Sequence, residues 1–156
     1  MICGITGQRR FDNKYPSHQL KQHIKLKLKE KFVELAATKI ISGMALSSDT
    51  LAVEVAIELK LPFIAALSFP EQDAYWSSAD KKKYNDLLEL AENVEIVNKS
   101  GYASWKYQAR NQWIVDNCDV LIAVFQPTTT FGGTKNCIDY ANVVKRTVVI
   151  IDPKAL

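Results

Sequence analysis

The sequence predicts one α/β domain over residues 1–156, with helices covering both faces of a mostly parallel sheet. Short apolar runs alternate with longer segments of helical period along the whole chain, the order expected of strand–helix–strand units. The runs PFIAALSF and DVLIAVF are almost continuously apolar, as in strands that are buried on both faces. A chain of 156 residues with 47% hydrophobic residues can bury such a core by itself. This three-layer arrangement is a Rossmann-like fold.

The strands follow from the apolar runs and the helices from positions that recur every three or four residues. The expected strands are MICGIT, KIISGM, PFIAALSF, VEIVN, DVLIAVF and TVVIID. Ser17 is expected to cap the first helix, in which Leu20, Ile24, Leu28, Phe32 and Leu35 recur at helical spacing. Ser48 or Asp49 is expected to cap the second helix. The remaining helices are expected from Asp80 to about Asn93, from Ser104 to about Asn117, and from Gly133 to Lys145.

Ligands of such folds bind beyond the carboxyl ends of the strands. This rule selects the loops 6–10, 42–49, 68–76, 98–104 and 126–134. In the first loop, Thr6, Gly7 and Arg9 offer a hydroxyl, a free backbone and a guanidinium, which suit a phosphate. The loop lacks the three-glycine dinucleotide fingerprint and a Walker lysine, and a simple turn with surface arginines is the alternative.

The second and fifth loops contain further candidates at helix starts. Ser42, Gly43 and Asp49 lie in the second loop, where helix capping alone would also explain Asp49. Glu54 follows about one helical turn later and points either to the same cleft or to solvent. The fifth loop has Gly132, Gly133 and Thr134 after the most apolar strand. Backbone amides at such a helix N-terminus bind anions; the alternative is a turn capped by Thr134.

The rest of the sequence contains three further candidate residues and shows no signal for a metal site or a membrane span. Arg110, Asn111 and Asp116 lie on the helix before the most apolar strand, while His18 and His23 belong to a lysine-rich helix and are expected at the surface. The three cysteines have no metal-like spacing, so we expect a reduced, cytoplasmic protein without a metal or cofactor. No apolar run approaches the roughly 18 residues of a membrane span.

Four segments together resemble the SLOG superfamily. They are GITGQRR, ISGMALSSDTLAVEVAIEL, RNQWIVDNCDVLIAVF and GGTKNCIDYANVVKRTVVII, which occur in the order found there and cover nearly the whole chain. The most similar branch is that of small bacterial and phage proteins that includes YpsA. More distant members are the LOG phosphoribohydrolases and the DNA-processing protein DprA. The resemblance implies a Rossmann-like fold that binds nucleotides or nucleotide-derived ligands.

The resemblance also implies roles for individual residues. The phosphate and ribose region would be lined by Gly43, Gly132, Gly133 and Thr134, with Thr6, Gly7, Arg9, Asp49, Glu54, Arg110 and Asn111 as neighbours. LOG enzymes have the motif Pro-Gly-Gly-x-Gly-Thr-x-x-Glu, and its glutamate takes part in glycosidic cleavage. Here Cys137 stands in the place of that glutamate. A thiol cannot replace a carboxylate in this chemistry. In addition, Gln8, Arg9 and Arg10 stand where the branch usually has His-Arg-Pro.

The leading hypothesis is therefore a protein that binds or senses a nucleotide or a related phosphorylated small molecule. The alternative is an N-glycosidase or nucleoside 5′-monophosphate phosphoribohydrolase that uses Glu54, Asp49 or Asp116 as its carboxylate. A DprA-like binder of single-stranded DNA is less favoured, because it needs a basic groove with aromatic platforms and the lysines here suggest solvated helix faces. By analogy with the superfamily, we also expect a homodimer.

Overall fold

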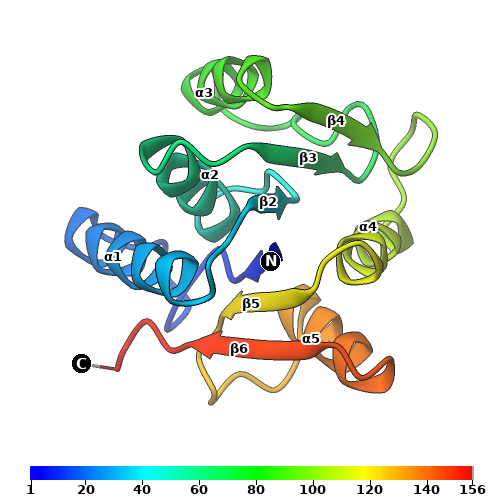
Figure 1. Cartoon of the computed structure of the whole chain (residues 1–156). Helices are drawn as coiled ribbons and strands as arrows, with labels where there is room; N and C mark the ends of the chain where they lie inside the picture. Colours follow the sequence, from blue (N-terminus) through cyan, green and yellow to red (C-terminus); the bar gives the residue numbers. More distant parts are fainter. Residues whose placement is uncertain (156) are drawn as a thin grey trace.

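The computed structural model describes residues 1–155 and contains a six-stranded sheet between two layers of helices (Figure 1). The strands are β1 (Ile2–Gly7), β2 (Lys39–Ser42), β3 (Phe63–Leu67), β4 (Asn93–Ile96), β5 (Val120–Val124) and β6 (Thr147–Ile151). The helices are α1 (His18–Glu34), α2 (Ser48–Glu58), α3 (Ser78–Glu89), α4 (Trp105–Asp116) and α5 (Gly133–Val143). All neighbouring strands pair in parallel, so the predicted α/β, Rossmann-like class is confirmed.

The strand order, β4-β3-β2-β1-β5-β6, places β1 at the centre of the sheet. From β1 the chain builds outward through β2, β3 and β4, and it then returns to add β5 and β6 on the other side. The chain therefore leaves β1 and β5 toward helices on opposite faces of the sheet (Figure 1), although Gly7 and Val124 at the ends of these strands are paired. In open α/β sheets this is the position where ligands bind.

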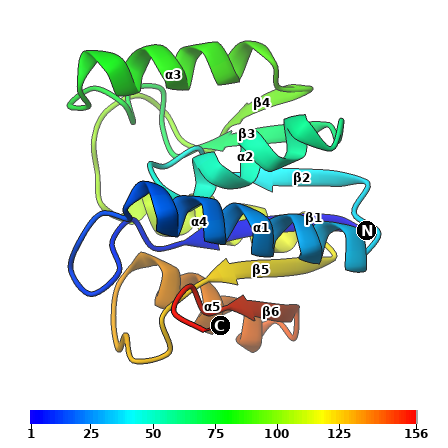
Figure 2. The same cartoon turned by 90° about the vertical axis from the view of Figure 1, so that its left-hand side faces the viewer.

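The helices divide into two layers that bury the two faces of the sheet. In Figure 1, α1, α2 and α3 lie on one side and α4 and α5 on the other, and Figure 2 shows the first layer from the front. Ile24, Leu28 and Phe32 of α1 pack in the core of the first layer, whereas Ile114 of α4 and Cys137 of α5 belong to the core of the second. Each helix thus buries an apolar stripe, as the periodicity predicted.

The helix starts agree with local sequence rules in part. The prediction for Ser17 is confirmed, because its Oγ accepts a hydrogen bond from the amide of Leu20 at 3.1 Å. The third helix begins earlier than predicted: Ser77 is its cap and accepts from the amide of Asp80 at 3.1 Å. Asp80 therefore lies within the first turn, where its negative charge interacts favourably with the positive end of the helix dipole.

Candidate functional site

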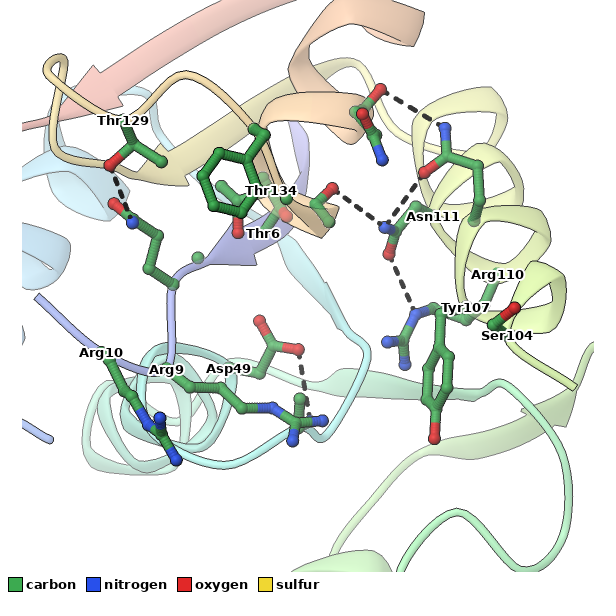
Figure 3. A pocket seen from close by; sticks show the side chains of 18 of the residues that line it. Thr6, Arg9, Arg10, Asp49, Ser104, Tyr107, Arg110, Asn111, Thr129 and Thr134 are labelled. Atoms are coloured by element: carbon green, nitrogen blue, oxygen red, sulfur yellow. Dashed lines mark hydrogen bonds between the residues drawn. The ribbon is translucent and has the colours of Figure 1, made fainter. Parts of the chain in front are cut away.

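The loops after β1, β2 and β5, together with one face of α4, enclose a cavity of about 610 Å³ at the carboxyl edge of the sheet (Figure 3). We call it the phosphate cavity, for reasons given below. Its volume lies in the range of small-molecule sites. The predicted ligand residues that line it are Thr6, Gly7, Arg9, Asp49, Arg110, Asn111, Gly132, Gly133 and Thr134. The structure thus brings together residues from four segments that are far apart in the sequence.

One wall of the cavity is the N-terminus of α5. Gly132 occupies the cap position with φ of 115° and no side-chain cap bond, so the alternative in which Thr134 caps this helix is wrong. The first amides of a helix have no intrahelical acceptor and form the positive end of its dipole. A Cβ added at Gly132 or Gly133 would meet no atom within 4 Å. The two glycines leave open space at the end of the helix that attracts anions.

The loop after β1 supplies two arginines. Arg9 is exposed, and Figure 3 shows its side chain extending past Asp49. The guanidinium of Arg10 lies 4.8 Å from the ring centroid of Tyr15, in a cation–π arrangement. Two cationic side chains and a helix N-terminus therefore face the same space.

Gln8, at the position where the related branch usually has histidine, fixes this loop in place. Its Oε1 accepts from the amide of Gln126 at 2.6 Å, and its Nε2 donates to Oγ1 of Thr129 at 3.0 Å. Gln126 and Thr129 lie in the loop after β5. The two loops that bound the phosphate cavity are thus tied to each other by side-chain hydrogen bonds.

Asp49 is a buried carboxyl group that lines this cavity, with only 6% of its surface exposed. Its Oδ2 accepts from the amide of Ala45 at 3.2 Å, while Oδ1 has no hydrogen-bond partner among residues 1–155. Burial raises the pKa of Asp49 to about 6, although the charge of Arg110, the Ala45 amide and the charge of Arg9 act in the opposite direction. The structure therefore contains a carboxyl group that titrates close to neutral pH.

Capping does not explain the polar residues at the start of α2. Ser47 occupies the cap position with φ of 71° and makes no side-chain cap bond. Ser48 instead donates from its Oγ to the carbonyl of Gln8 at 2.8 Å. The predicted caps Ser48 and Asp49 are thus corrected: both side chains reach back to loop backbone rather than to helix amides.

Arg110 has a structural role besides its place in the cavity wall. Its Nη1 donates to the carbonyl of Gly43, which follows β2, at 2.6 Å and to the carbonyl of Ala66, near the end of β3, at 3.2 Å. Its Nε donates to Oδ1 of Asn111 at 3.1 Å. Burial lowers the pKa of this guanidinium, against the charge of Asp49, which raises it. Arg110 therefore joins α4 to the edges of two strands.

Two predicted ligand residues do not line the phosphate cavity. A Cβ added at Gly43 would lie 2.6 Å from Cζ of Arg110, so this glycine makes room for a side chain rather than for a ligand. Ser42 is fully buried, and its Oγ donates to the carbonyl of Asp49 at 3.0 Å and accepts from the amide of Met44 at 3.1 Å. Both residues support the loop around Asp49 and do not face the cavity.

Two of the three candidate catalytic carboxylates also lie elsewhere. Glu54 forms ion pairs with Lys25 at 3.2 Å and with Lys83, which join α2 to α1 and α3. Asp116 is the last residue of α4 and accepts from the hydroxyl of Tyr140 at 2.7 Å. Because α4 runs back toward the amino ends of the parallel strands, Asp116 lies at the opposite edge of the sheet. Only Asp49 remains in the cavity.

Cys137, which stands in the place of the LOG glutamate, faces the core. It is fully buried among residues of α4, α5 and the sheet, and burial raises the pKa of its thiol to about 12. The other two cysteines, Cys3 and Cys118, are also free and buried. None of the three lines the phosphate cavity.

The structure adds cavity residues that the sequence analysis did not single out as ligand residues. These are Gln8, Arg10, Tyr15, Ala45, Ser104, Tyr107, Gln108, Thr129, Phe131 and Asn136. Tyr107 and Gln108 could have been found, because each precedes Arg110 or Asn111 by three residues and so shares a helix face with it. Phe131 gave no signal, since an aromatic residue in a loop has no periodicity to interpret.

The lysine-rich helix α1 is largely neutralised by neighbouring carboxylates. Its ion pairs are Lys25–Glu54, Lys27–Glu30, Lys29–Glu58 and Lys31–Glu34.

Among residues 1–155, none of the helices has the length and apolar character that a membrane span requires. The same stretch contains no group of three His, Cys, Asp or Glu residues placed to hold a metal ion.

The fold has three layers, a parallel sheet between two layers of helices, and its cavity lies where the strand order reverses. These features define a Rossmann-like protein with a site for a small ligand. The family model YpsA, described as the YspA SLOG family, matches residues 5–155. The chain therefore belongs to this family, and the resemblance inferred from its four segments is confirmed.

Individual relatives agree with this assignment. The uncharacterized SPbeta prophage-derived protein YoqJ of Bacillus subtilis (strain 168) is 33% identical over 146 residues, which cover 78% of this chain and 84% of YoqJ. DprA from Streptococcus pneumoniae matches with a TM-score of 0.69 at 20% identity, over 96% of this chain and 50% of that one. DprA from Helicobacter pylori, whose structure is described in terms of its single-stranded DNA binding mode, matches with a TM-score of 0.66 at 21% identity. That match covers 96% of this chain and 64% of the Helicobacter protein. The likeness to the two DprA structures shows a shared fold, and this chain spans less than two thirds of either.

Proposed function

We propose that the protein binds a nucleotide, or a phosphorylated small molecule derived from one, in the phosphate cavity. The proposal rests above all on Asp49, a buried carboxyl group with an unpartnered oxygen in the same cavity as cationic anion-binding groups. A buried polar atom without a partner costs free energy. A ligand hydroxyl that donates to Oδ1 would remove this cost. Membership of the SLOG family supports the same class of ligand.

The phosphate would lie at the N-terminus of α5. The amides of Gly133 and Thr134 are among those that a helix leaves free, and the absence of atoms within 4 Å of a Cβ at Gly133 leaves room for phosphate oxygens. Arg9 lines the same cavity and would add a charge-assisted hydrogen bond. The hydroxyls of a sugar attached to this phosphate would then extend toward Asp49, which lines the same cavity (Figure 3).

Binding without cleavage is the favoured form of this function. Glycosidic cleavage requires a carboxylate within reach of the scissile bond. Cys137 faces the core, and Glu54 and Asp116 lie outside the cavity. Of the candidate carboxylates, Asp49 alone lines the cavity, and it does not stand in the place of the LOG glutamate. The protein would therefore hold its ligand as a sensor or carrier does.

A thermal-shift and calorimetric series tests the proposal. AMP, ADP-ribose and ribose 5-phosphate should raise the unfolding midpoint, because a ligand that binds only the native state stabilises it by mass action. Arg9→Ala should weaken binding of all three by about tenfold or more, since hydrogen bonds to charged groups contribute about 1.5–3 kcal/mol. Lys21→Ala, which removes an exposed cation of α1 outside the cavity, is the matched control. Absence of any shift for all phosphorylated compounds would contradict the proposal.

Asp49 gives one reason to consider an N-glycosidase as a second function. Its pKa of about 6 is suitable for a general acid or base near neutral pH. Mass spectrometry of AMP after incubation separates the two functions: a binder returns intact AMP, and an enzyme releases free base. If base appears, Asp49→Asn should abolish its release, while Glu54→Gln, at a position outside the cavity, should leave the rate unchanged.

A further inference from the structure

A second cavity, of about 970 Å³, adjoins the phosphate cavity. Its lining is rich in aromatic residues, and we call it the aromatic cavity. Its aromatic lining residues are Tyr15, Phe69, Tyr75, Trp76, Tyr102 and Tyr107. Arg9, Tyr15 and Tyr107 line both cavities. The two cavities therefore share a wall that contains a cation and two phenol rings.

The rings that line the aromatic cavity come from separate segments of the chain. Phe69, Tyr102 and Tyr107 form one cluster, with centroids 5.8–6.3 Å apart in edge-to-face contacts. Tyr75 and Trp76, from the loop after β3, also line the cavity. Tyr102 is 71% exposed and Tyr75 is 97% exposed. Exposed aromatic side chains gathered around one hollow indicate a binding surface.

The loop that presents Tyr102 is held in a fixed conformation. Glu71 accepts from Oγ of Ser100 and from the amide of Gly101, each at 2.7 Å. Nζ of Lys106 donates to the carbonyls of Lys99 at 2.9 Å, Ser100 at 3.3 Å and Gly101 at 2.6 Å. Lys106 is only 9% exposed, so its charge serves this loop rather than solvent. An aromatic wall that is ordered in advance loses less entropy when a ring stacks on it.

We infer that the aromatic cavity binds the flat ring of the same ligand whose phosphate lies in the phosphate cavity, with Arg9 at the junction. This inference rests on the proposed function and adds that the ligand has an aromatic base. Aromatic side chains stack on every base with little dependence on its hydrogen-bonding edge. Arg9 is placed where a negatively charged group between the two parts would meet a cation. The phosphate cavity thus recognises the anion and the aromatic cavity recognises the base.

The experiment compares AMP with ribose 5-phosphate, which lacks the ring, by isothermal titration calorimetry on the full chain. The wild type should bind AMP about tenfold or more tightly than ribose 5-phosphate, as expected from stacking of one base. Tyr102→Ala should remove most of this difference and leave the affinity for ribose 5-phosphate unchanged. Tyr102→Phe keeps the ring and should restore the preference for AMP.

Trp105→Ala is a further control, because Trp105 is 62% exposed and lines neither cavity. It should not change either affinity. Equal affinities of the wild type for AMP and ribose 5-phosphate would overturn the inference, and so would an equal loss of both in Tyr102→Ala. In these cases sensitivity of both ligands to Arg9→Ala would still support the proposed function.

Two other results would remove the inference together with its basis. If neither compound binds, the proposed function fails as well. If a dT oligonucleotide binds while AMP, ADP-ribose and ribose 5-phosphate do not, the two cavities belong to a site for a DNA strand. A steep decrease of that binding with salt would identify contacts to the DNA backbone.

Discussion

The loops after β2 and β5 both contain glycine at the carboxyl edge of the sheet, but the space beside each glycine is used differently. Beside Gly43 lies the guanidinium of Arg110, which donates to the Gly43 carbonyl. Beside Gly132 and Gly133 there is no atom within 4 Å of an added Cβ. The first loop is filled by the protein itself, whereas the second borders the phosphate cavity.

This difference shows that a glycine at a ligand-binding edge has two physical explanations. A glycine that contacts a side chain is required by packing, and its replacement should reduce stability. A glycine that contacts nothing is required by its backbone conformation or by a ligand. In the first case its replacement should reduce stability through backbone strain, and in the second it should change binding. Substitutions at Gly43, Gly132 and Gly133 separate these explanations, and Asp49→Asn tests the buried carboxyl group of the same site.

Gly43→Ala should give the largest loss of stability. The new methyl group would lie 2.6 Å from Cζ of Arg110, and this buried guanidinium would have to move away from the carbonyls of Gly43 and Ala66. Overpacking of this kind costs about 1–3 kcal/mol, and a displaced buried charge adds to that cost. We expect the free energy of unfolding in urea to decrease by about 3 kcal/mol. A variant as stable as the wild type would show that Arg110 does not need this space.

Asp49→Asn should stabilise the ligand-free protein at pH 8. The pKa of Asp49 rises from 3.8 to about 6 on folding, so the native state binds more protons between these values and the free energy of unfolding falls as the pH rises through them. Asparagine avoids this loss. We expect the variant to exceed the wild type by about 3 kcal/mol at pH 8, and the difference to disappear below about pH 4.

The difference between the two proteins is the relevant quantity for Asp49, because it cancels the titration of other carboxyl groups. Hydrogen bonds with Gln126 and Ser100 lower the pKa values of Asp12 and Glu71, respectively. These two groups therefore increase the free energy of unfolding as the pH rises, opposite to Asp49. Urea unfolding curves at several pH values measure the difference directly. A constant difference from pH 4 to pH 8 would be inconsistent with a buried Asp49 that titrates near neutrality.

Gly132→Ala should have a smaller effect, which comes from backbone strain alone. Gly132 has φ of 115° and ψ of 176°, a region that is essentially restricted to glycine, and alanine there should cost about 1–2 kcal/mol, in the lower part of the range for such strain. No atom lies within 4 Å to add a clash. Thermal unfolding should show a decrease of the midpoint that is smaller than that of Gly43→Ala. A larger decrease would mean that the loop after β5 is packed more tightly than the loop after β2.

The sequence predicted the architecture because its signals are local. Alternating apolar runs and helical periods located all the strands and helices, and the topological rule selected the loops that form both cavities. The role of Gly43 could not be predicted, because it depends on Arg110, which lies 67 positions away on α4. The sequence left the placement of Glu54 open for the same reason, since its partners Lys25 and Lys83 belong to α1 and α3. Long-range side-chain contacts decided each of these cases.

The aromatic cavity shows the same limit for the site. The loops after β3 and β4 were expected at the ligand edge, but nothing in their sequences indicated that Phe69, Tyr102 and Tyr107 would meet. Cys137 differs, because its position relative to the glycines was evident from the sequence, and burial then explained why it cannot act in the cavity. Motif spacing identified what had been lost, while the structure was needed to find what surrounds the ligand.

Gly133→Ala is the sharpest test of the comparison, because it should change binding with almost no effect on stability. Gly133 is the first residue of α5 and does not have a positive φ, so alanine fits the backbone, and the free energy of unfolding should change by less than about 0.5 kcal/mol. Its methyl group would enter the space proposed for phosphate oxygens. We expect the affinity for AMP and ribose 5-phosphate to decrease by about tenfold, which corresponds to about 1.4 kcal/mol. Calorimetry on the variant, with urea unfolding as the stability control, measures both quantities. Unchanged affinity would mean that the phosphate binds away from the N-terminus of α5, and the open space beside the two glycines would then need another explanation.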